Sequence, residues 1–189
     1  MAEFKNITKK YGDKTVLDNF SLTLLKGSKT VIMGESGCGK TTLLRIAAGL
    51  EKPDNGEFSS DESIALMFQE PRLLHWKTAL ENVRAILPKE QKSLADKYLS
   101  AVGLEDDKNK YPRELSGGMA QRVAFARFLA YAEATGATLL LLDEPFSALD
   151  DETAAKMLDL IKDFSKDKTL LMVAHHLPDT SFSDNIVTL

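Results

Sequence analysis

One segment restricts the possible folds of this chain more than any other: residues 34–41, which read GESGCGKT. The spacing G-x-x-x-x-G-K-[S/T] forms a phosphate-binding loop when it lies between a strand and a helix. Successive backbone N–H groups of the loop then point at one anionic ligand, and the helix adds its positive N-terminal end. Both neighbours are predicted here, since residues 30–33 form a short apolar run and residues 40–48 are helical in character. The sequence therefore predicts a polyphosphate site rather than a plain glycine turn.

The positions of this loop have distinct expected parts. Lys40 is expected to reach the β- and γ-phosphates of a nucleotide, and Thr41 to offer its hydroxyl to Mg²⁺. The glycines allow backbone conformations that other residues resist. The residues expected to contact the nucleotide in this segment are Gly34, Glu35, Ser36, Gly37, Cys38, Gly39, Lys40, Thr41 and Thr42.

An acidic pair follows a run of four leucines at residues 139–142. Such a run predicts a strand buried on both faces, and ligands of open α/β sheets bind at the carboxyl ends of the strands. Asp143 at that position suits an indirect contact with Mg²⁺, and Glu144 is placed to polarise an attacking water as a general base. The alternative is an acidic turn that caps the next helix.

The remaining pattern predicts an α/β fold with a P-loop NTPase core. Strand-like runs occur at residues 4–8, 16–24, 30–33, 63–68, 138–142 and 169–174. Residues 78–130 are helical in pattern, and an amphipathic helix is expected over residues 154–164. We therefore expect a mainly parallel sheet, an N-terminal antiparallel β region and a helical insert.

These elements fit one domain over residues 1–189. Its core is expected to comprise about residues 1–69 and 131–189, with a helical subdomain at about residues 70–130. Residues 53–56, which read PDNG, predict a turn, and Gly103 predicts the end of a helix. The strand at residues 169–174 is expected to be the last one.

Composition narrows the class of protein further. The chain has 28 acidic and 24 basic residues, a net charge of −4, which argues against a dedicated nucleic-acid-binding protein. No apolar run approaches the roughly 20 residues of a membrane-spanning helix, and the N-terminus does not resemble a signal peptide. Its single cysteine, Cys38, cannot form an intrachain disulfide. We therefore expect a cytoplasmic protein.

A third motif, LSGG at residues 115–118, opens the helix that is expected to run to about residue 130. Ser116 is a typical N-cap, and Gly117 and Gly118 expose backbone N–H groups at a second positive helix end. We expect this end to approach the γ-phosphate from the opposite side, supplied by another copy of the chain. Simple capping and flexibility is the alternative.

Together these motifs resemble those of the ATP-binding subunit of ABC transporters, in the right order and over nearly the whole chain. The resemblance implies binding of ATP and Mg²⁺, ATP hydrolysis, and a homodimer that forms on ATP binding. It also implies that Tyr11 stacks on adenine, although Tyr11 could instead cover an edge of the sheet. Gln69 would contact Mg²⁺ and the attacking water, and would couple them to a membrane subunit.

Two further positions take their expected roles from the same resemblance. Residues 147–150, SALD, match the loop that joins the two active sites of the dimer, so Asp150 is expected near ATP. His175 matches the histidine that contacts the γ-phosphate, and is preferred over the neighbouring His176 because it follows the strand directly. Arg122 and Arg127 are expected to be surface or packing residues rather than catalytic ones.

The family resemblance also implies partners and a location. We expect integral-membrane permease subunits, a solute-binding protein, and a place on the cytoplasmic face of the cell membrane. Residues 68–76, FQEPRLLHW, are similar to the corresponding segment of bacterial importers for nitrate, sulfonates and taurine. Leu73, Leu74 and Trp76 could equally be core or interface residues that carry no information about the solute.

The chain departs from the family pattern in a few places. It is short between Gly49 and Gln69 and after His175, and Met119 stands where a glutamine is usual. Residues 131–138 form a longer stretch than usual before the acidic strand.

Three rival interpretations of the function fit less well. A DNA-repair ATPase would need a coiled coil between residues 42 and 114, a translation-associated member would usually carry two cassettes, and a P-loop kinase leaves the LSGG motif unexplained.

Overall fold

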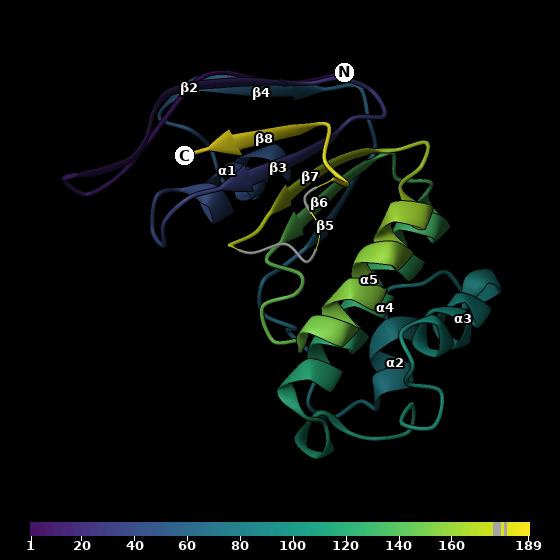
Figure 1. The fold of residues 1–189 in the computed structure, drawn as a ribbon. Coiled ribbons are helices and arrows are strands. Elements are labelled where there is room, and N and C mark those ends of the chain that lie inside the picture. The colour runs from purple at the N-terminus through teal and green to yellow at the C-terminus, as the bar shows by residue number, and fades with distance from the viewer. Residues whose placement is uncertain (176–178, 180) are drawn as a thin grey trace.

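The chain is arranged in layers around a parallel sheet (Figure 1). The structure, a computed structural model, describes residues 1–175, 179 and 181–189. The strands of the described part follow the order β5-β6-β7-β3-β8 in this sheet, and every neighbouring pair is parallel. The strands are β3 (Lys29–Met33), β5 (Ile64–Met67), β6 (Leu139–Asp143), β7 (Thr169–Val173) and β8 (Asn185–Thr188). β6 and β7 are buried along their whole length, as their apolar sequences predict.

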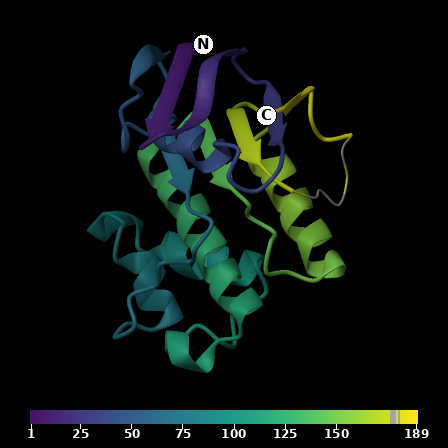
Figure 2. The same ribbon diagram turned by 90° about the vertical axis from the view of Figure 1, so that its left-hand side faces the viewer.

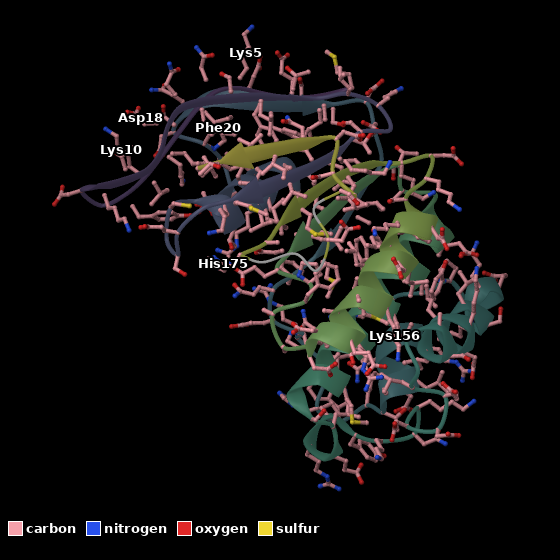
Figure 3. The ribbon with its side chains drawn as sticks, viewed as in Figure 1. Lys5, Lys10, Asp18, Phe20, Lys156 and His175 are labelled. Atoms are coloured by element: carbon pink, nitrogen blue, oxygen red, sulfur yellow. The ribbon has the colours of Figure 1, made fainter. Side chains whose placement is uncertain are left out.

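A second, antiparallel sheet lies over the first and is drawn at the top of Figure 1. Its strands, in the order β2-β1-β4, are β1 (Ala2–Tyr11), β2 (Lys14–Leu24) and β4 (Asn55–Ser60). β1 buries Ala2, Phe4 and Ile7 in the core, and the centroid of the Phe4 ring lies 4.6 Å from that of Phe58 and 6.3 Å from that of Phe20. Phe20 can be found beneath the antiparallel sheet in Figure 3. This sheet is the predicted N-terminal β region.

The two faces of the parallel sheet pack against different elements. Residues of one face, such as Leu139 and Leu141, join a core with α1 (Lys40–Ala47) and the antiparallel sheet. Residues of the other face, such as Leu140 and Leu142, join a core with the remaining helices. These are α2 (Ala79–Arg84), α3 (Ser93–Ala101), α4 (Gly117–Thr135) and α5 (Asp151–Phe164), with short 3-10 helices at Lys89–Gln91 and Pro112–Glu114. Figure 2 shows α4 and α5 passing along this second face.

Several sequence predictions about these elements are confirmed, and others are wrong. α5 buries Ala154, Met157, Leu158 and Ile161 as the amphipathic pattern predicts. The turn expected at residues 53–56 is shorter, because β4 already begins at Asn55 and pairs with β1. The strand at residues 169–174 is not the last, since β8 follows it and pairs with β3.

The helix that starts at Gly117 continues to Thr135, beyond the predicted end at residue 130. Gly136, at φ 65°, terminates it in a left-handed conformation that suits glycine. The longer stretch noted at residues 131–138 is therefore mostly helix. The expected boundary between helical subdomain and core falls inside α4, so one rigid element belongs to both parts. No helix of the described residues is long and apolar enough to cross a membrane.

Candidate functional site

Four neighbouring strands of the parallel sheet end at the same edge, and each is followed by a predicted site residue. The glycine-rich loop follows β3, Gln69 follows β5, Glu144 follows β6 and His175 follows β7. Because the strands are parallel and adjacent, their carboxyl ends bring these segments together from positions far apart in the sequence. Figure 3 shows His175 beyond the tips of the strands at this edge.

The loop itself is shaped by close backbone contacts. Gly39 has φ 108°, and a Cβ there would lie 2.6 Å from the carbonyl oxygen of Val16. A Cβ at Gly34 would lie 2.7 Å from the carbonyl oxygen of Leu189. Only glycine therefore fits at these two positions. The buried side chain of Lys40 curls inside the loop, where its ammonium donates to the carbonyl groups of Gly34 and Glu35, each at 2.7 Å.

A cavity of about 550 Å³ opens beside this loop. Such a volume lies within the range of small-molecule sites in proteins. It is lined by Tyr11, Val16, Ser36, Gly37, Gly39, Lys40, Thr41, Thr42, Gln69, Glu144 and His175. The structure thus brings the predicted catalytic residues and the predicted adenine-stacking residue to one cavity with the loop.

Glu144 is held between two of the predicted residues. Its Oε1 lies 3.0 Å from Nε2 of His175, and its Oε2 accepts a hydrogen bond of 3.2 Å from the Gln69 amide. The backbone of Glu144 is left-handed, at φ 45°, and its N–H donates to Val173. This conformation is unfavourable for a non-glycine residue and persists only where the surroundings impose it. The carboxylate, whose side chain is 13% exposed, is therefore fixed at the cavity wall.

Asp143 occupies a different setting at the last position of β6. Burial raises the pKa of its carboxyl group, and a hydrogen bond with Thr41 offsets part of that rise. Its Oδ1 is buried and has no hydrogen-bond partner among the described residues. A cavity of about 90 Å³ beside it is lined in part by Thr41, Gln69 and Asp143. A buried carboxylate oxygen without a partner, next to hydroxyl and amide oxygens, is a donor set that fits Mg²⁺.

Tyr11, the last residue of β1, also lines the larger cavity. The residue is 47% exposed, and its hydroxyl donates to Glu51 and lies 3.4 Å from the Thr42 hydroxyl. Burial and the Glu51 carboxylate raise the pKa of Tyr11. Lys9 stands 3.3 Å from Glu51. Sequence reasoning missed Glu51 and Lys9, because a charged residue in a loop or on a strand carries no distinguishing pattern.

The residues of the LSGG motif and of the 147–150 loop do not line this cavity. The Ser116 hydroxyl caps α4 by accepting from the Met119 N–H at 3.2 Å, and Asp150 caps α5 by accepting from Thr153. A Cβ at Gly118 would lie 3.1 Å from the carbonyl oxygen of Ala148, so the start of α4 packs against the 147–150 loop. Figure 2 shows this end of α4 at the bottom of the molecule, far from the loop beside α1. These residues do not line the cavity beside the glycine-rich loop of their own chain, and their role in a dimer stays a prediction. His176 lies outside the described residues.

Three polar side chains of α4 hydrogen-bond to backbone carbonyl groups of other segments, and sequence reasoning did not single out one of them, Gln121. The buried Gln121 donates to the carbonyl group of Pro145, directly after Glu144, at 3.2 Å. Arg127 donates to the carbonyl groups of Pro71 and Arg72 at 2.6 and 3.1 Å. Arg122 donates to carbonyl groups at the end of α3. The two arginines agree with the expectation of packing residues. Polar residues that recur within an otherwise buried helix are the sequence signal that could have identified these side chains as partners of backbone carbonyl groups.

Comparisons with known proteins give a consistent result. The sequence profile of the family described as ABC transporter matches residues 17–147. The chain is 41% identical to "Aliphatic sulfonates import ATP-binding protein SsuB 1" of Burkholderia lata, over 97% of this chain and 59% of that protein. It is 44% identical to SsuB 2 of Paraburkholderia xenovorans, over 92% of this chain and 66% of that protein. The chain thus spans about three fifths to two thirds of the length of these relatives.

Solved structures are similar over the whole chain. The ATP-binding cassette MJ0796, in a dimeric post-hydrolysis state bound to ADP and Pi, is 33% identical, with a TM-score of 0.89. The match covers 100% of this chain and 94% of that one. A second dimeric structure of MJ0796, described as a bacterial ABC transporter cassette, has a TM-score of 0.90 at the same identity and coverage.

Proposed function

The chain belongs to the ABC transporter family, and from this we propose that it binds and hydrolyses ATP as the ATP-binding subunit of a membrane importer for a small solute. The observation that carries the proposal is the carboxylate of Glu144, held by Gln69 and His175 at the wall of the cavity that the phosphate loop borders. A DNA-repair or translation-associated ATPase is the less favoured alternative, because the similar curated proteins are named as import proteins.

The residues of the loop and sheet edge would divide the work of binding. Lys40 and the backbone N–H groups of the loop would bind the β- and γ-phosphates, and Tyr11 would stack on the adenine. Thr41, Gln69 and Asp143 would hold Mg²⁺, with Asp143 in indirect contact. When bound, Mg²⁺ neutralises charge that develops on the phosphate oxygens. The orphaned oxygen of Asp143 supports this assignment.

Glu144 would act as the general base. It would accept a proton from the water that attacks the γ-phosphate, while Gln69 orients that water and His175 contacts the γ-phosphate. Positioned proton transfer of this kind contributes about 10²- to 10⁴-fold to a rate. Gln69 and His175 hold Glu144 from two sides, which fixes the carboxylate before the water arrives.

A second copy of the chain would complete each site. Ser116, Gly117, Gly118 and Asp150 do not line the cavity of their own chain, but they lie together at the start of α4 and in the loop packed against it. A symmetric dimer would place these residues of one chain against the nucleotide of the other. The two dimeric structures of MJ0796 support this arrangement.

The membrane partners follow from the relatives rather than from the site. We infer that the chain works with permease subunits and a solute-binding protein on the cytoplasmic face of the membrane. The names of the relatives as aliphatic sulfonate import proteins support an importer, and make small sulfonates the first solutes to test.

The direct test is an ATPase assay on the purified chain. We expect release of phosphate from ATP that depends on Mg²⁺ and stops when EDTA removes it, because the charge of the phosphates would then be unscreened. A chain that binds no ATP in the presence of Mg²⁺, measured by equilibrium binding of a fluorescent analogue, would contradict the proposal. Copurification with a permease from membranes tests the importer assignment separately.

Cys38 gives a chemical test of where the phosphates bind. Its sulfur lies 3.8 Å from the Lys40 ammonium and 2.9 Å from the position of a Cβ on Gly34, so it is directed into the loop. A maleimide on this thiol is therefore expected to abolish ATP hydrolysis, and saturating MgATP to prevent the labelling. Whatever activity Cys38→Ala retains should be insensitive to the reagent. Rapid labelling under saturating MgATP with unchanged turnover would show that the phosphates bind elsewhere.

A further inference from the structure

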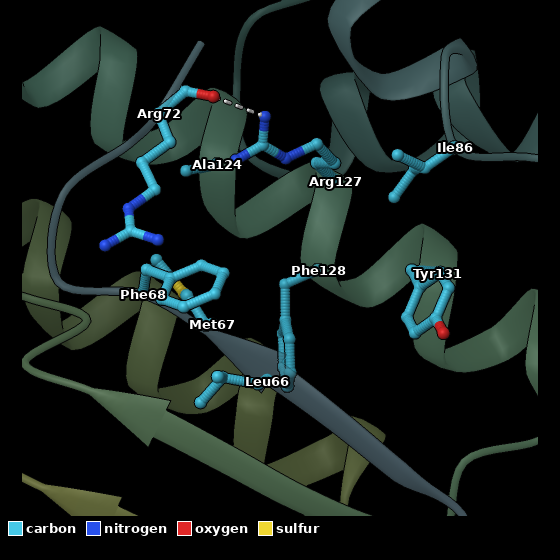
Figure 4. A pocket seen from close by; sticks show the side chains of 9 residues that line it. All are labelled: Leu66, Met67, Phe68, Arg72, Ile86, Ala124, Arg127, Phe128 and Tyr131. Carbon is cyan, nitrogen blue, oxygen red and sulfur yellow. Dashed lines mark hydrogen bonds between the residues drawn. The ribbon is translucent and has the colours of Figure 1, made fainter. Parts of the chain in front are cut away.

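The segment that follows Gln69 is tied to α4 by one side chain. Residues 70–74 form neither helix nor strand, so no regular backbone pairing holds them. Arg127 of α4 donates through Nη2 to the carbonyl group of Pro71 at 2.6 Å and through Nη1 to that of Arg72 at 3.1 Å. Figure 4 shows the second of these bonds. α4 therefore fixes the backbone two and three residues beyond Gln69.

Within the same segment, a residue before Gln69 and a residue after it are in contact. The guanidinium group of Arg72 lies over the ring of Phe68, 4.0 Å from its centroid (Figure 4). Arg72 also has a left-handed backbone, at φ 46°. A non-glycine residue keeps such a conformation only where its neighbours hold it. Phe68 and Arg72 flank Gln69, so the contact between them limits how far the Gln69 backbone can move independently of Arg72.

From this segment the contacts continue to the candidate base. The Gln69 amide donates to Oε2 of Glu144 at 3.2 Å, which is near the long end of an ordinary hydrogen bond. A displacement of the Pro71 backbone by a few tenths of an ångström, passed on to Gln69, would weaken or break this bond. A continuous set of contacts thus runs from Arg127 through the carbonyl groups to Gln69 and Glu144.

The chemistry of the arginine suits this task. Arg127 is half-buried, and burial lowers the pKa of its guanidinium, which nevertheless stays charged at any physiological pH. The planar fork can donate to two successive carbonyl groups at once, whereas a lysine ammonium has no such fixed geometry. Arg122, one and a half turns earlier on α4, is also half-buried and also donates to two successive carbonyl groups, those of Val102 and Gly103. Its hydrogen bonds within the described residues go to the end of α3 and not to the segment after Gln69, so it is a matched comparison.

We propose that Arg127 is a positioning residue for Gln69, and that it sets the distance between the Gln69 amide and Glu144 by holding the carbonyl groups of Pro71 and Arg72. The consequence for catalysis rests on the proposed ATPase function. The opposing interpretation is that Arg127 only fills space at the mouth of an apolar cavity of about 330 Å³, to whose lining Phe68, Ile86 and Tyr131 also contribute (Figure 4). In that case its loss would lower stability without a specific effect on Gln69.

The first arm of the test measures the mobility of the segment without any need for hydrolysis. Cys38 is the only cysteine of the chain, so a Cys38→Ala, Glu70→Cys background accepts a single nitroxide label next to Gln69. We expect Arg127→Met to narrow the electron paramagnetic resonance lines of this label, because the backbone loses its anchor. Arg122→Met in the same background should leave the lines unchanged.

The second arm measures steady-state ATP hydrolysis. Arg127→Met is expected to lower kcat about tenfold with little change in KM for MgATP, because a misplaced positioning group costs rate rather than binding. Arg122→Met should stay near the wild-type kcat, while both variants lose comparable thermal stability. Because Arg127 is proposed to act through Gln69, adding Arg127→Met to Gln69→Ala should cause no further loss of kcat.

Each arm has an outcome that overturns the proposal. Unchanged label mobility in Arg127→Met would show that Arg127 does not anchor the segment. If the kcat of the Arg127→Met, Gln69→Ala double variant falls by the product of the two single losses, Arg127 acts by a route other than Gln69. If Arg127→Met does not fold, Arg127→Lys, which keeps the charge but not the fork, is used in its place with the same criteria. If the wild-type chain hydrolyses no ATP, the proposed function fails, and the label alone decides whether Arg127 holds the segment.

Discussion

Replacement of Glu144 by glutamine is expected to lower ATP hydrolysis by about 100-fold or more while ATP binding is retained. Glutamine has the shape of glutamate and keeps an oxygen to accept from the Gln69 amide, which donates to Glu144 at 3.2 Å in the structure. It cannot accept a proton from water, so only the chemical step is removed. The measurement is phosphate release at saturating MgATP beside equilibrium binding of a fluorescent ATP analogue.

This variant should also trap the dimer. If ATP holds two chains together until it is hydrolysed, Glu144→Gln is expected to elute as a dimer with MgATP and as a monomer without it in size-exclusion chromatography. Glu152→Gln is a suitable control, because Glu152 is exposed on α5 and forms its ion pair with Lys156 of the same helix. Near-normal turnover of Glu144→Gln would remove Glu144 from the role of base.

A mixture of two inactive variants is expected to regain activity. Ser116→Arg should bind ATP as a monomer but hydrolyse almost none, because a large cation at the start of α4 would block the joining of two chains. Lys40→Ala should be inactive because it lacks the ammonium that the loop positions for the phosphates. In a mixed dimer, one site carries both lesions and the other carries neither. With equal amounts of the two chains and random pairing, about a quarter of the sites would be intact.

The recovery decides whether the sites are shared between chains. Mixed dimers must be demonstrated first, for example by copurification through an affinity tag on one of the two chains. Partial ATPase activity in the mixture, absent from either variant alone, is the expected result. Demonstrated mixed dimers without recovery would mean that Ser116 acts within its own chain or not at all.

The parts of the fold that could be predicted from the sequence are those whose signal is local. The phosphate loop depends on glycines at fixed spacing between a strand and a helix, so eight consecutive residues are enough to recognise it. β6 and β7 are buried on both faces and therefore consist almost wholly of apolar residues. α5 buries one face and shows it as a period of 3.6 residues.

Elements without such a local signal were missed. β8 is four residues long and mostly exposed, and it becomes a strand only because β3 offers an unpaired edge. β4 begins with Asn55 and Gly56, which favour a turn, but these residues are part of the strand because β4 pairs with β1. In both strands the partner strand supplies the structure that the sequence does not specify.

The sequence by itself determined the chemistry of the site: a loop that can hold a polyphosphate, an acidic pair after a buried strand, and the residue types Gln69 and His175 after two others. Only the tertiary structure decided which of these groups meet. Parallel pairing of β5, β6 and β7 brings Gln69, Glu144 and His175 into contact across as many as 106 positions, while Ser116 is carried away from them by α4. The supporting contacts of Gln121 and Arg127 are likewise set by packing, because a backbone carbonyl group looks the same at every position of a sequence and only the fold selects the one that a side chain reaches.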